Sequence, residues 1–347
     1  MFAGVIEGFF GNAWGFAARR DAAEFLARAG YHFYLYAPKS DPWLRRRWRE
    51  PIPAERAAEF AALAAHCRAR NLAFGVGLTP FEVFRDYDDT ARADLRRKVA
   101  QLDELGCEVL CILFDDMRGD LPRLAQLQVR IVDDITSWST ARRYIFCPTY
   151  YSYDALLARA FGAPPPDYLA DIGRLIDSRI EIFWTGEVVC SDCYPRGHLD
   201  EVAELLRRRP FIWDNNIAND ARKRCARLFL SPDRGRWELD PAAVAGIAIN
   251  PMNQAYLSQV ALCGYAKLLG LRGVTEQDCL ALCGEPVAGL LRDRRPLVEE
   301  QGLEAFEPAE RERWVAMLRA AAGDPYAAEL LAWLNGEYRF DPACLTE

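Results

Sequence analysis

The chain has 347 residues, 51% of them hydrophobic, which is enough for one large domain or two ordinary ones with a sizeable core. Against 43 Lys and Arg stand 50 Asp and Glu, and the net charge of −7 argues against a general binder of nucleic acid or of membrane surfaces. No 18-residue apolar segment is present, so we expect no membrane span, and the N-terminal residues show no signal-peptide pattern.

Short apolar runs alternate with longer amphipathic runs over the first 270 residues. The apolar runs predict eight β-strands, which begin near residues 2, 31, 72, 108, 144, 180, 210 and 244. The amphipathic runs predict helices, for example within residues 19–30, 54–71, 91–106 and 199–209. Several of these runs end in Gly or Asn just before the next strand, as helix C-termini commonly do.

Eight strand–helix units at this spacing predict an α/β fold, a (β/α)8 TIM barrel, whose usual size is about 250 residues. The nearly continuous apolar strands are typical of a parallel sheet that helices cover. A doubly wound open sheet is the alternative. It is less favoured because no glycine-rich phosphate-binding fingerprint follows the first strand.

From about residue 270, helical patterns follow one another without intervening strands, at 290–302, 308–323 and 325–338. We therefore assign residues 1–270 to the (β/α)8 barrel and residues 271–347 to a small helical C-terminal region. That region either packs on the barrel or supplies the contact of a homodimer. Four apolar residues of this region could lie either in the hydrophobic core or in a dimer interface, and we favour the core. They are Leu330, Leu331, Trp333 and Leu334.

Polar and aromatic residues follow the predicted strands, where a barrel of this kind builds its active site. They are Glu7, Gly8, Lys39, Asp115, Asp116, Tyr151, Trp184, Asp214, Asn215 and Asn250. A zinc site would need several His ligands, and the three His residues lie elsewhere in the sequence, so we expect neither a metal nor a cofactor. Carboxylates beside aromatic rings suit a sugar instead, because its hydroxyls need acceptors and its CH faces pack on rings.

Asp115 and Asp116 stand side by side after an apolar run, although neighbouring carboxylates resist ionising together. A helix cap or a solvated turn would also explain them. In a regular strand the two side chains point to opposite faces, so both can serve one pocket only where the strand ends. Adjacent acids cannot flank a glycosidic bond as two acids from different strands do. They better suit a substrate that supplies its own nucleophile.

The eleven Cys residues mostly lie in apolar runs, which predicts buried thiols and a reducing, cytoplasmic location. Cys190 and Cys193 form a C-x-x-C without a second pair, so we expect no metal or redox role for them. The basic run RRRWRE, from Arg45 to Glu50, could meet an anionic partner, but a solvated or ion-paired loop is favoured.

Seven blocks in one order resemble glycoside hydrolase family 84, the O-GlcNAcases and related β-N-acetylglucosaminidases. The blocks, which span residues 2 to about 265, are GVIEGFFGNAW, YLYAPKSDPWLRRRWRE, ILFDDM, FCPTYY, FWTG, IWDNNIAND and NPMNQA. The chain departs from the family pattern at Phe10, where Tyr is common, and at Ser40, where Asp is frequent.

The resemblance implies a retaining exo-β-N-acetylglucosaminidase in which the substrate's acetamido oxygen attacks the anomeric carbon and forms an oxazoline. Asp115 would orient and polarise the acetamido N–H, and Asp116 would act as general acid and then as general base. Tyr151 would hydrogen-bond the acetamido oxygen, Trp213 would wall its pocket, and Asn215 would hold groups near the reacting centre. The sugar hydroxyls would be held by the Gly8 carbonyl, Lys39, Asp220 and Asn250.

Other interpretations remain open at this stage. The enzyme could be endo-acting and cleave inside a polysaccharide, like a hyaluronidase. Alternatively, the barrel could bind GlcNAc without catalysis. The alternative role of Lys39 is an ion pair with Asp41, and that of Trp184 is packing in the barrel. Asp214 and Asn219 could be turn residues that cap the following helix. The expected partner is a glycoprotein or oligosaccharide bearing β-linked GlcNAc, and neither a nucleic acid nor a membrane.

Overall fold

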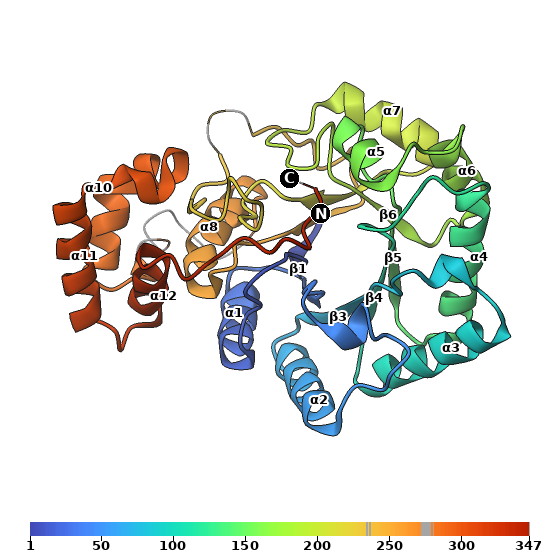
Figure 1. Ribbon diagram of the computed structural model, residues 1–347, viewed down its shortest axis with the longest axis horizontal. Helices are drawn as coiled ribbons and strands as arrows, with labels where there is room; N and C mark the ends of the chain where they lie inside the picture. Colours follow the sequence, from blue (N-terminus) through green and yellow to red (C-terminus); the bar gives the residue numbers. More distant parts are fainter. Residues whose placement is uncertain (234, 236, 272–278, 280, 347) are drawn as a thin grey trace.

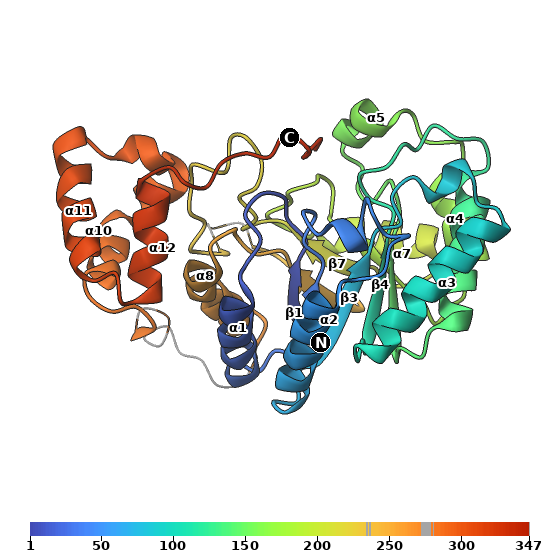
Figure 2. The same ribbon diagram turned by 60° about the horizontal axis from the view of Figure 1, so that its bottom comes forward.

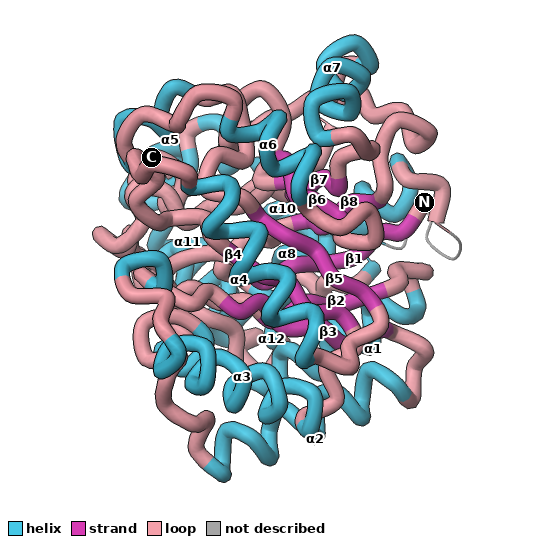
Figure 3. Tube along the Cα trace, turned by 90° about the vertical axis from the view of Figure 1, so that its right-hand side faces the viewer, coloured by secondary structure: helices cyan, strands magenta, loops and turns pink. Residues whose placement is uncertain are grey.

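A computed structural model describes residues 1–347 except residues 234, 236, 272–278, 280 and 347. Eight parallel strands close a barrel in chain order, and helices surround it (Figures 1 and 3). The strands are β1 Phe2–Glu7, β2 Phe33–Tyr36, β3 Ala73–Leu78, β4 Val109–Leu113, β5 Arg143–Cys147, β6 Glu181–Trp184, β7 Phe211–Asp214 and β8 Gly246–Ile249. Each begins within two residues of its predicted start, and the predicted (β/α)8 barrel is confirmed.

The barrel helices follow the amphipathic runs. They are α1 Phe16–Arg28, α2 Ala54–Arg68, α3 Asp89–Glu104, α4 Leu124–Trp138, α5 Ala155–Phe161, α6 Tyr168–Leu175, α7 Arg196–Leu206 and α8 Ala255–Leu268. Gly30 and Gly106, just beyond α1 and α3, have φ of 83° and 84°, and Asn71 beyond α2 has φ of 56°. This left-handed backbone ends a helix, and Gly and Asn adopt it most readily, so the terminators predicted from the sequence act as expected.

The connection between β7 and β8 departs from the strand–helix alternation. Residues 215–245 contain no α-helix among those that the structure describes. This long loop starts directly at the carboxyl end of β7 and carries Asn215 and Asp220. The irregular connection therefore brings two of the predicted site residues to the mouth of the barrel.

Glu7, at the end of β1, belongs to the core and not to the pocket suggested by its position. Its carboxylate is fully buried and forms an ion pair of 2.7 Å with Arg19 of α1. The same carboxylate accepts hydrogen bonds from the Tyr34 hydroxyl and from the backbone N–H of Trp14. It thus joins α1, β2 and the loop after β1 beneath the site.

We expect Arg19→Ala to lower the free energy of unfolding by about 3–5 kcal/mol, because Glu7 keeps a buried carboxylate without its cation. Arg179 is a matched control: its ion pair with Asp177 is also 2.7 Å long, but its side chain is 87% exposed. Arg179→Ala should leave stability nearly unchanged, since solvent screens exposed pairs. Urea denaturation of both variants measures the difference, and equal losses would contradict this account.

The C-terminal helices are α10 Val287–Glu300, α11 Pro308–Ala320 and α12 Pro325–Leu334, and they lie beside α8 at one side of the barrel (Figure 1). Glu329 of α12 accepts hydrogen bonds from the backbone N–H groups of Tyr256 and Leu257, at 2.8 and 3.0 Å, in the first turn of α8. This contact satisfies two N–H groups that a helix start leaves unpaired.

Three of the apolar residues of α12, Leu330, Trp333 and Leu334, are buried within the chain, as favoured from the sequence, while Leu331 is half-buried. The domain boundary predicted after residue 270 adjoins residues 272–278, which lie outside the described residues, and it stays a prediction. A homodimer that forms through the C-terminal region also stays a prediction. In the described part of the chain, no helix is long and apolar enough to cross a membrane.

Candidate active site

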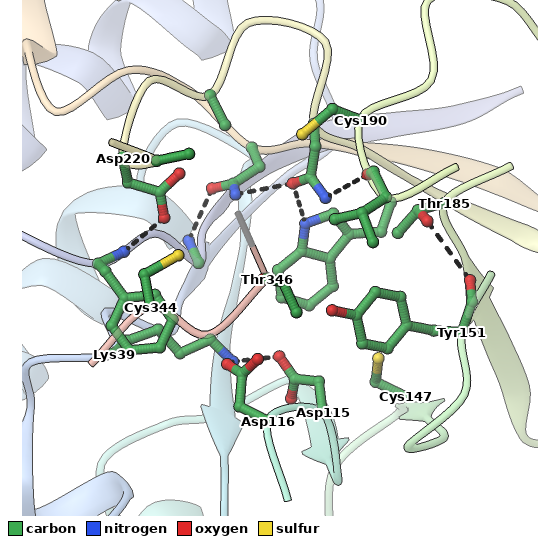
Figure 4. A pocket seen from close by; sticks show the side chains of 18 residues that line it. Lys39, Asp115, Asp116, Cys147, Tyr151, Thr185, Cys190, Asp220, Cys344 and Thr346 are labelled. Carbon is green, nitrogen blue, oxygen red and sulfur yellow. Dashed lines mark hydrogen bonds and ion pairs between the residues drawn. The ribbon is translucent and has the colours of Figure 1, made fainter. Parts of the chain in front are cut away.

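One pocket opens at the carboxyl ends of the barrel strands, and Figure 4 shows the side chains that line it. The structure brings all nine predicted site residues to its wall: Gly8, Lys39, Asp115, Asp116, Tyr151, Trp213, Asn215, Asp220 and Asn250. They come from the ends of β1, β2, β4, β5, β7 and β8 and from the β7–β8 loop. The barrel therefore assembles the cluster from segments far apart in the sequence.

Asp115 and Asp116 lie in a turn that begins directly after β4. The last ladder hydrogen bond joins the Phe114 N–H to the Cys147 carbonyl at 2.9 Å, and the strand ends there. Asp116 then takes a left-handed backbone with φ of 58°, which Asp tolerates better than most residues. The turn replaces the alternation of a strand, so both carboxylates line the same pocket.

Lys39 binds both aspartates from the end of β2. Its ammonium forms an ion pair with Asp115 and lies 3.4 Å from Asp116 Oδ2. All three side chains are buried, so solvent screens the three charges little. Asp41, the alternative partner of Lys39, instead accepts hydrogen bonds from the Tyr36 hydroxyl and the Trp43 N–H, and it caps the 3-10 helix Pro42–Leu44.

Burial raises the pKa of Asp116 above its ordinary value, and the charge of Asp115 raises it further, while Lys39 opposes both. Burial alone would lower the pKa of Lys39, but Asp115 and Asp116 raise it, so the ammonium stays charged. Asp116 thus holds its proton more readily than an ordinary aspartate does. Asp115 differs in its contacts: its Oδ1 is buried and accepts no hydrogen bond from any residue that the structure describes.

The basic run after β2 is only partly the solvated loop predicted from the sequence. Arg47 and Glu50 form an exposed ion pair, as expected. Arg45 is buried, however, with its guanidinium 4.8 Å from the centroid of the Phe81 ring, and Trp48 is buried completely. Arg45 lies near enough to the site to lower the pKa of Asp116, so it adds positive charge behind the aspartates.

An amide network fixes the opposite wall. Asn250 accepts a hydrogen bond from the Gly8 N–H at 3.1 Å and donates one of 2.9 Å to Asn215 Oδ1. The indole N–H of Trp213 donates to the same oxygen at 2.9 Å. A Cβ on Gly8 would lie 2.4 Å from the Trp213 ring, so only glycine lets this ring pass so close to the backbone.

Asp220 and Tyr151 complete the predicted set. Asp220 Oδ2 accepts a hydrogen bond from the Phe10 N–H at 2.9 Å, and burial raises the pKa of this carboxyl. The Tyr151 carbonyl accepts from the Thr185 N–H at 3.0 Å, which fixes the residue against β6. Burial raises the pKa of the Tyr151 hydroxyl far above its usual value, so the hydroxyl stays a donor.

Three residues set aside in the sequence analysis have structural partners. The indole N–H of Trp184 donates a hydrogen bond of 2.9 Å to His198 Nε2, and neither residue lines the pocket. Asp214 accepts from the Asn216 N–H and from the Tyr265 hydroxyl, at 2.7 and 2.9 Å. Asn219 accepts from the Asn253 N–H, also at 2.9 Å.

The sequence analysis did not assign the other residues that line the pocket to the site: Phe10, Cys147, Thr185, Val189, Cys190, Ala218, Ala221, Cys344 and Thr346. Cys147 and Thr185 stand at the ends of β5 and β6, so their positions could have indicated them. Cys344 and Thr346 follow the last helix, and no periodic pattern points to them. All eleven cysteines are free thiols, and no cluster of three or more metal-ligating side chains exists within the described residues.

Known proteins are similar to this chain in sequence and in fold. A family model described as beta-N-acetylglucosaminidase matches residues 3–274. The protein O-GlcNAcases of Mus musculus and Rattus norvegicus are each 31% identical over 269 residues, which is 75% of this chain and 29% of the mammalian proteins. The chain therefore spans less than a third of the length of these curated relatives.

A solved structure extends the similarity to most of the chain. An O-GlcNAc hydrolase variant from Thermobaculum terrenum matches with a TM-score of 0.73 and 27% sequence identity, and the match covers 96% of this chain and 74% of that one. The family model alone covers well over half of the chain, including the barrel strands from Ala3 on and all nine predicted site residues. The chain belongs to the β-N-acetylglucosaminidase family of glycoside hydrolases.

Proposed function

We propose that this chain is an exo-acting β-N-acetylglucosaminidase that removes terminal β-linked GlcNAc with retention of configuration. The nucleophile is the acetamido oxygen of the substrate, and an oxazoline is the intermediate. Family membership supports the reaction class. The arrangement of Asp115, Asp116 and Lys39 supports the mechanism.

The observation that carries the proposal is that no residue in the described part of the chain donates a hydrogen bond to the buried Asp115 Oδ1. A buried acceptor without a donor costs about 1–3 kcal/mol, so such atoms call for a functional explanation. An acetamido N–H is a donor of the right kind. While Lys39 holds one oxygen of Asp115, the other can accept this N–H and thereby make the acetamido oxygen a better nucleophile.

Asp116 acts as the general acid in this scheme. Its buried site favours the protonated form, which is the form that delivers a proton to the leaving oxygen. After the leaving group departs, the ionised carboxylate lies beside Lys39 and takes a proton from the attacking water. Tyr151, which keeps its proton, donates a hydrogen bond to the acetamido oxygen.

Asp220 is the carboxylate that a rival scheme would use as a nucleophile on the enzyme. A nucleophilic carboxylate must be ionised, whereas burial favours the protonated form of Asp220. Its Oδ2 is also engaged by the Phe10 N–H. These features suit a group that binds a sugar hydroxyl, and the same role is proposed for Asn250.

The physiological substrate in this proposal is a glycoprotein or an oligosaccharide with terminal GlcNAc. The similarity to a protein O-GlcNAcase and to an O-GlcNAc hydrolase supports a GlcNAc-bearing substrate. A cytoplasmic site of action remains part of the proposal, and the eleven free thiols support it.

A panel of aryl glycosides tests the function. We expect hydrolysis of the β-GlcNAc substrate and a kcat/KM about 10⁴ lower for the β-glucoside, because a site built for a hydrogen-bonding group rejects the analogue that lacks it. An aryl β-GalNAc substrate reports the tolerance at the 4-hydroxyl. Comparable hydrolysis of the glucoside, or binding of GlcNAc without turnover of any substrate, would contradict the proposal.

A further inference from the structure

The segment Asp341–Thr346, called the strap below, crosses the mouth of the barrel. It follows α12 and runs from the C-terminal helices back over the carboxyl ends of the strands (Figure 2). Two of its side chains, Cys344 and Thr346, line the same pocket as Asp115 and Asp116, and Figure 4 shows them among the site residues. The strap thus reaches the site from outside the barrel.

The strap has a defined local structure. The Cys344 N–H donates to the Asp341 carbonyl at 3.0 Å, and the Ala343 N–H donates to Asp341 Oδ1 at 2.9 Å. Asp followed by Pro is a favoured start for such a turn, because the Asp side chain accepts the backbone N–H and Pro fixes φ. The turn leaves Cys344 buried and the next side chain, Leu345, 53% exposed.

The strap contacts groups that the proposed function assigns to the sugar. Thr346 lines the pocket together with Tyr151, whose hydroxyl is assigned to the acetamido oxygen, and lies near enough to lower the pKa of that hydroxyl against the effect of burial. The Cys344 thiol lies near enough to Asp220 and Asp116 for their charges to act on it. The cavity that remains in the pocket measures about 50 Å³, room for a few waters, whereas ligand pockets usually measure about 300–1,000 Å³.

Two contacts that hold the chain just before the strap are weak. The Arg222 guanidinium, from the β7–β8 loop, lies 4.4 Å from the centroid of the Phe340 ring. Asn12 Nδ2 donates to the Glu337 carbonyl at 3.4 Å, at an exposed position. Contacts of this kind contribute little each, so the strap can leave the pocket without unfolding the barrel.

We propose that the strap is an autoinhibitory segment, which occupies the sugar site in this structure and must move out before a GlcNAc-bearing substrate binds. Strap and sugar compete for Tyr151 and Asp220. The apparent affinity for substrate is therefore reduced by the fraction of molecules in which the strap is closed. This inference rests on the proposed function only for the identity of the competing ligand.

Phe340→Ala tests the competition, because it removes the ring that Arg222 covers and leaves the pocket side chains intact. We expect KM for an aryl β-GlcNAc substrate to fall about two- to fivefold with kcat unchanged, the effect of losing one exposed cation–π contact. Leu345→Ala is the matched control, since it truncates an exposed strap residue, and KM should stay the same. A rise in KM for Phe340→Ala would mean that the strap helps to bind substrate, which overturns the proposal.

Alkylation by iodoacetamide, mapped by peptide mass spectrometry, follows the strap without using activity. Phe340→Ala should raise the alkylation rate of Cys344 in the absence of ligand, and an unchanged rate would contradict a movable strap. In the unmodified protein, saturating GlcNAc should expose Cys344 and protect Cys190, which also lines the pocket. If GlcNAc protects both thiols, the strap closes over the sugar and does not compete with it. If GlcNAc affects neither thiol while Phe340→Ala still exposes Cys344, the proposed ligand is wrong and the movable strap stands.

Discussion

Asp116→Asn should lower kcat/KM by about 10²–10⁴ on substrates with poor leaving groups and far less on activated aryl glycosides. The physical reason is that a poor leaving oxygen needs a proton as the glycosidic bond breaks, and Asn has none to give. The buried position of Asp116 beside Asp115 favours the protonated acid that this step requires. A series of aryl β-GlcNAc substrates that spans leaving-group pKa values measures the difference. Equal loss across the series would contradict the assignment of Asp116 as general acid.

The stability of Asp116→Asn, measured as a function of pH, is a control for folding. Because the pKa of Asp116 is raised in the folded state, the native protein holds this proton more tightly than the unfolded chain does. The contribution of Asp116 to stability therefore falls as pH rises from its unfolded pKa through its folded pKa. Asn does not ionise, so Asp116→Asn should be more stable relative to the unmodified protein at neutral than at acidic pH. A variant that loses both activity and stability at neutral pH would point to misfolding instead.

The barrel was predictable because short segments of the sequence specify each of its strands and helices. Apolar runs, amphipathic runs and terminators such as Gly30 and Asn71 each specify a short segment, and the regular succession of segments specifies the closed sheet. The aspartate pair was predictable as a pair because an apolar run in the sequence ends at Phe114, directly before Asp115. The positive φ of Asp116, which turns its carboxylate toward the pocket, has no signal beyond the residue type.

The sequence does not show contacts between residues that lie far apart in the chain. Glu7 stands at a strand end like the other candidates, but Arg19 and Tyr34 hold its carboxylate in the core, and no sequence pattern reports that pairing. Arg45 looked like part of a solvated basic loop, yet it packs on Phe81. The strap was missed for the same reason: Asp341 and Pro342 indicate a turn, but nothing in the sequence says that the turn faces the pocket.

Fluorination of the substrate should have a large effect on kcat, because the proposed nucleophile is the acetamido oxygen of the substrate. Fluorinating the acetyl group withdraws electron density from the acetamido oxygen while changing its size only slightly. If this oxygen attacks, kcat should fall progressively from acetyl through mono-, di- and trifluoroacetyl substrates, and each tenfold fall corresponds to about 1.4 kcal/mol of lost transition-state stabilisation. Asp115→Ala should flatten the remaining slope, because the variant lacks the carboxylate that polarises the acetamide.

The rival is attack by an enzyme carboxylate, for which Asp220 is the remaining acid in the described pocket wall. In that case the acetamide only binds, and fluorination mainly changes KM. The fluorination series, measured on kcat with the chemical step rate-limiting, therefore tests the central claim most directly. A steady fall in kcat with each added fluorine is the predicted result, and a flat kcat across the series would contradict substrate-assisted catalysis.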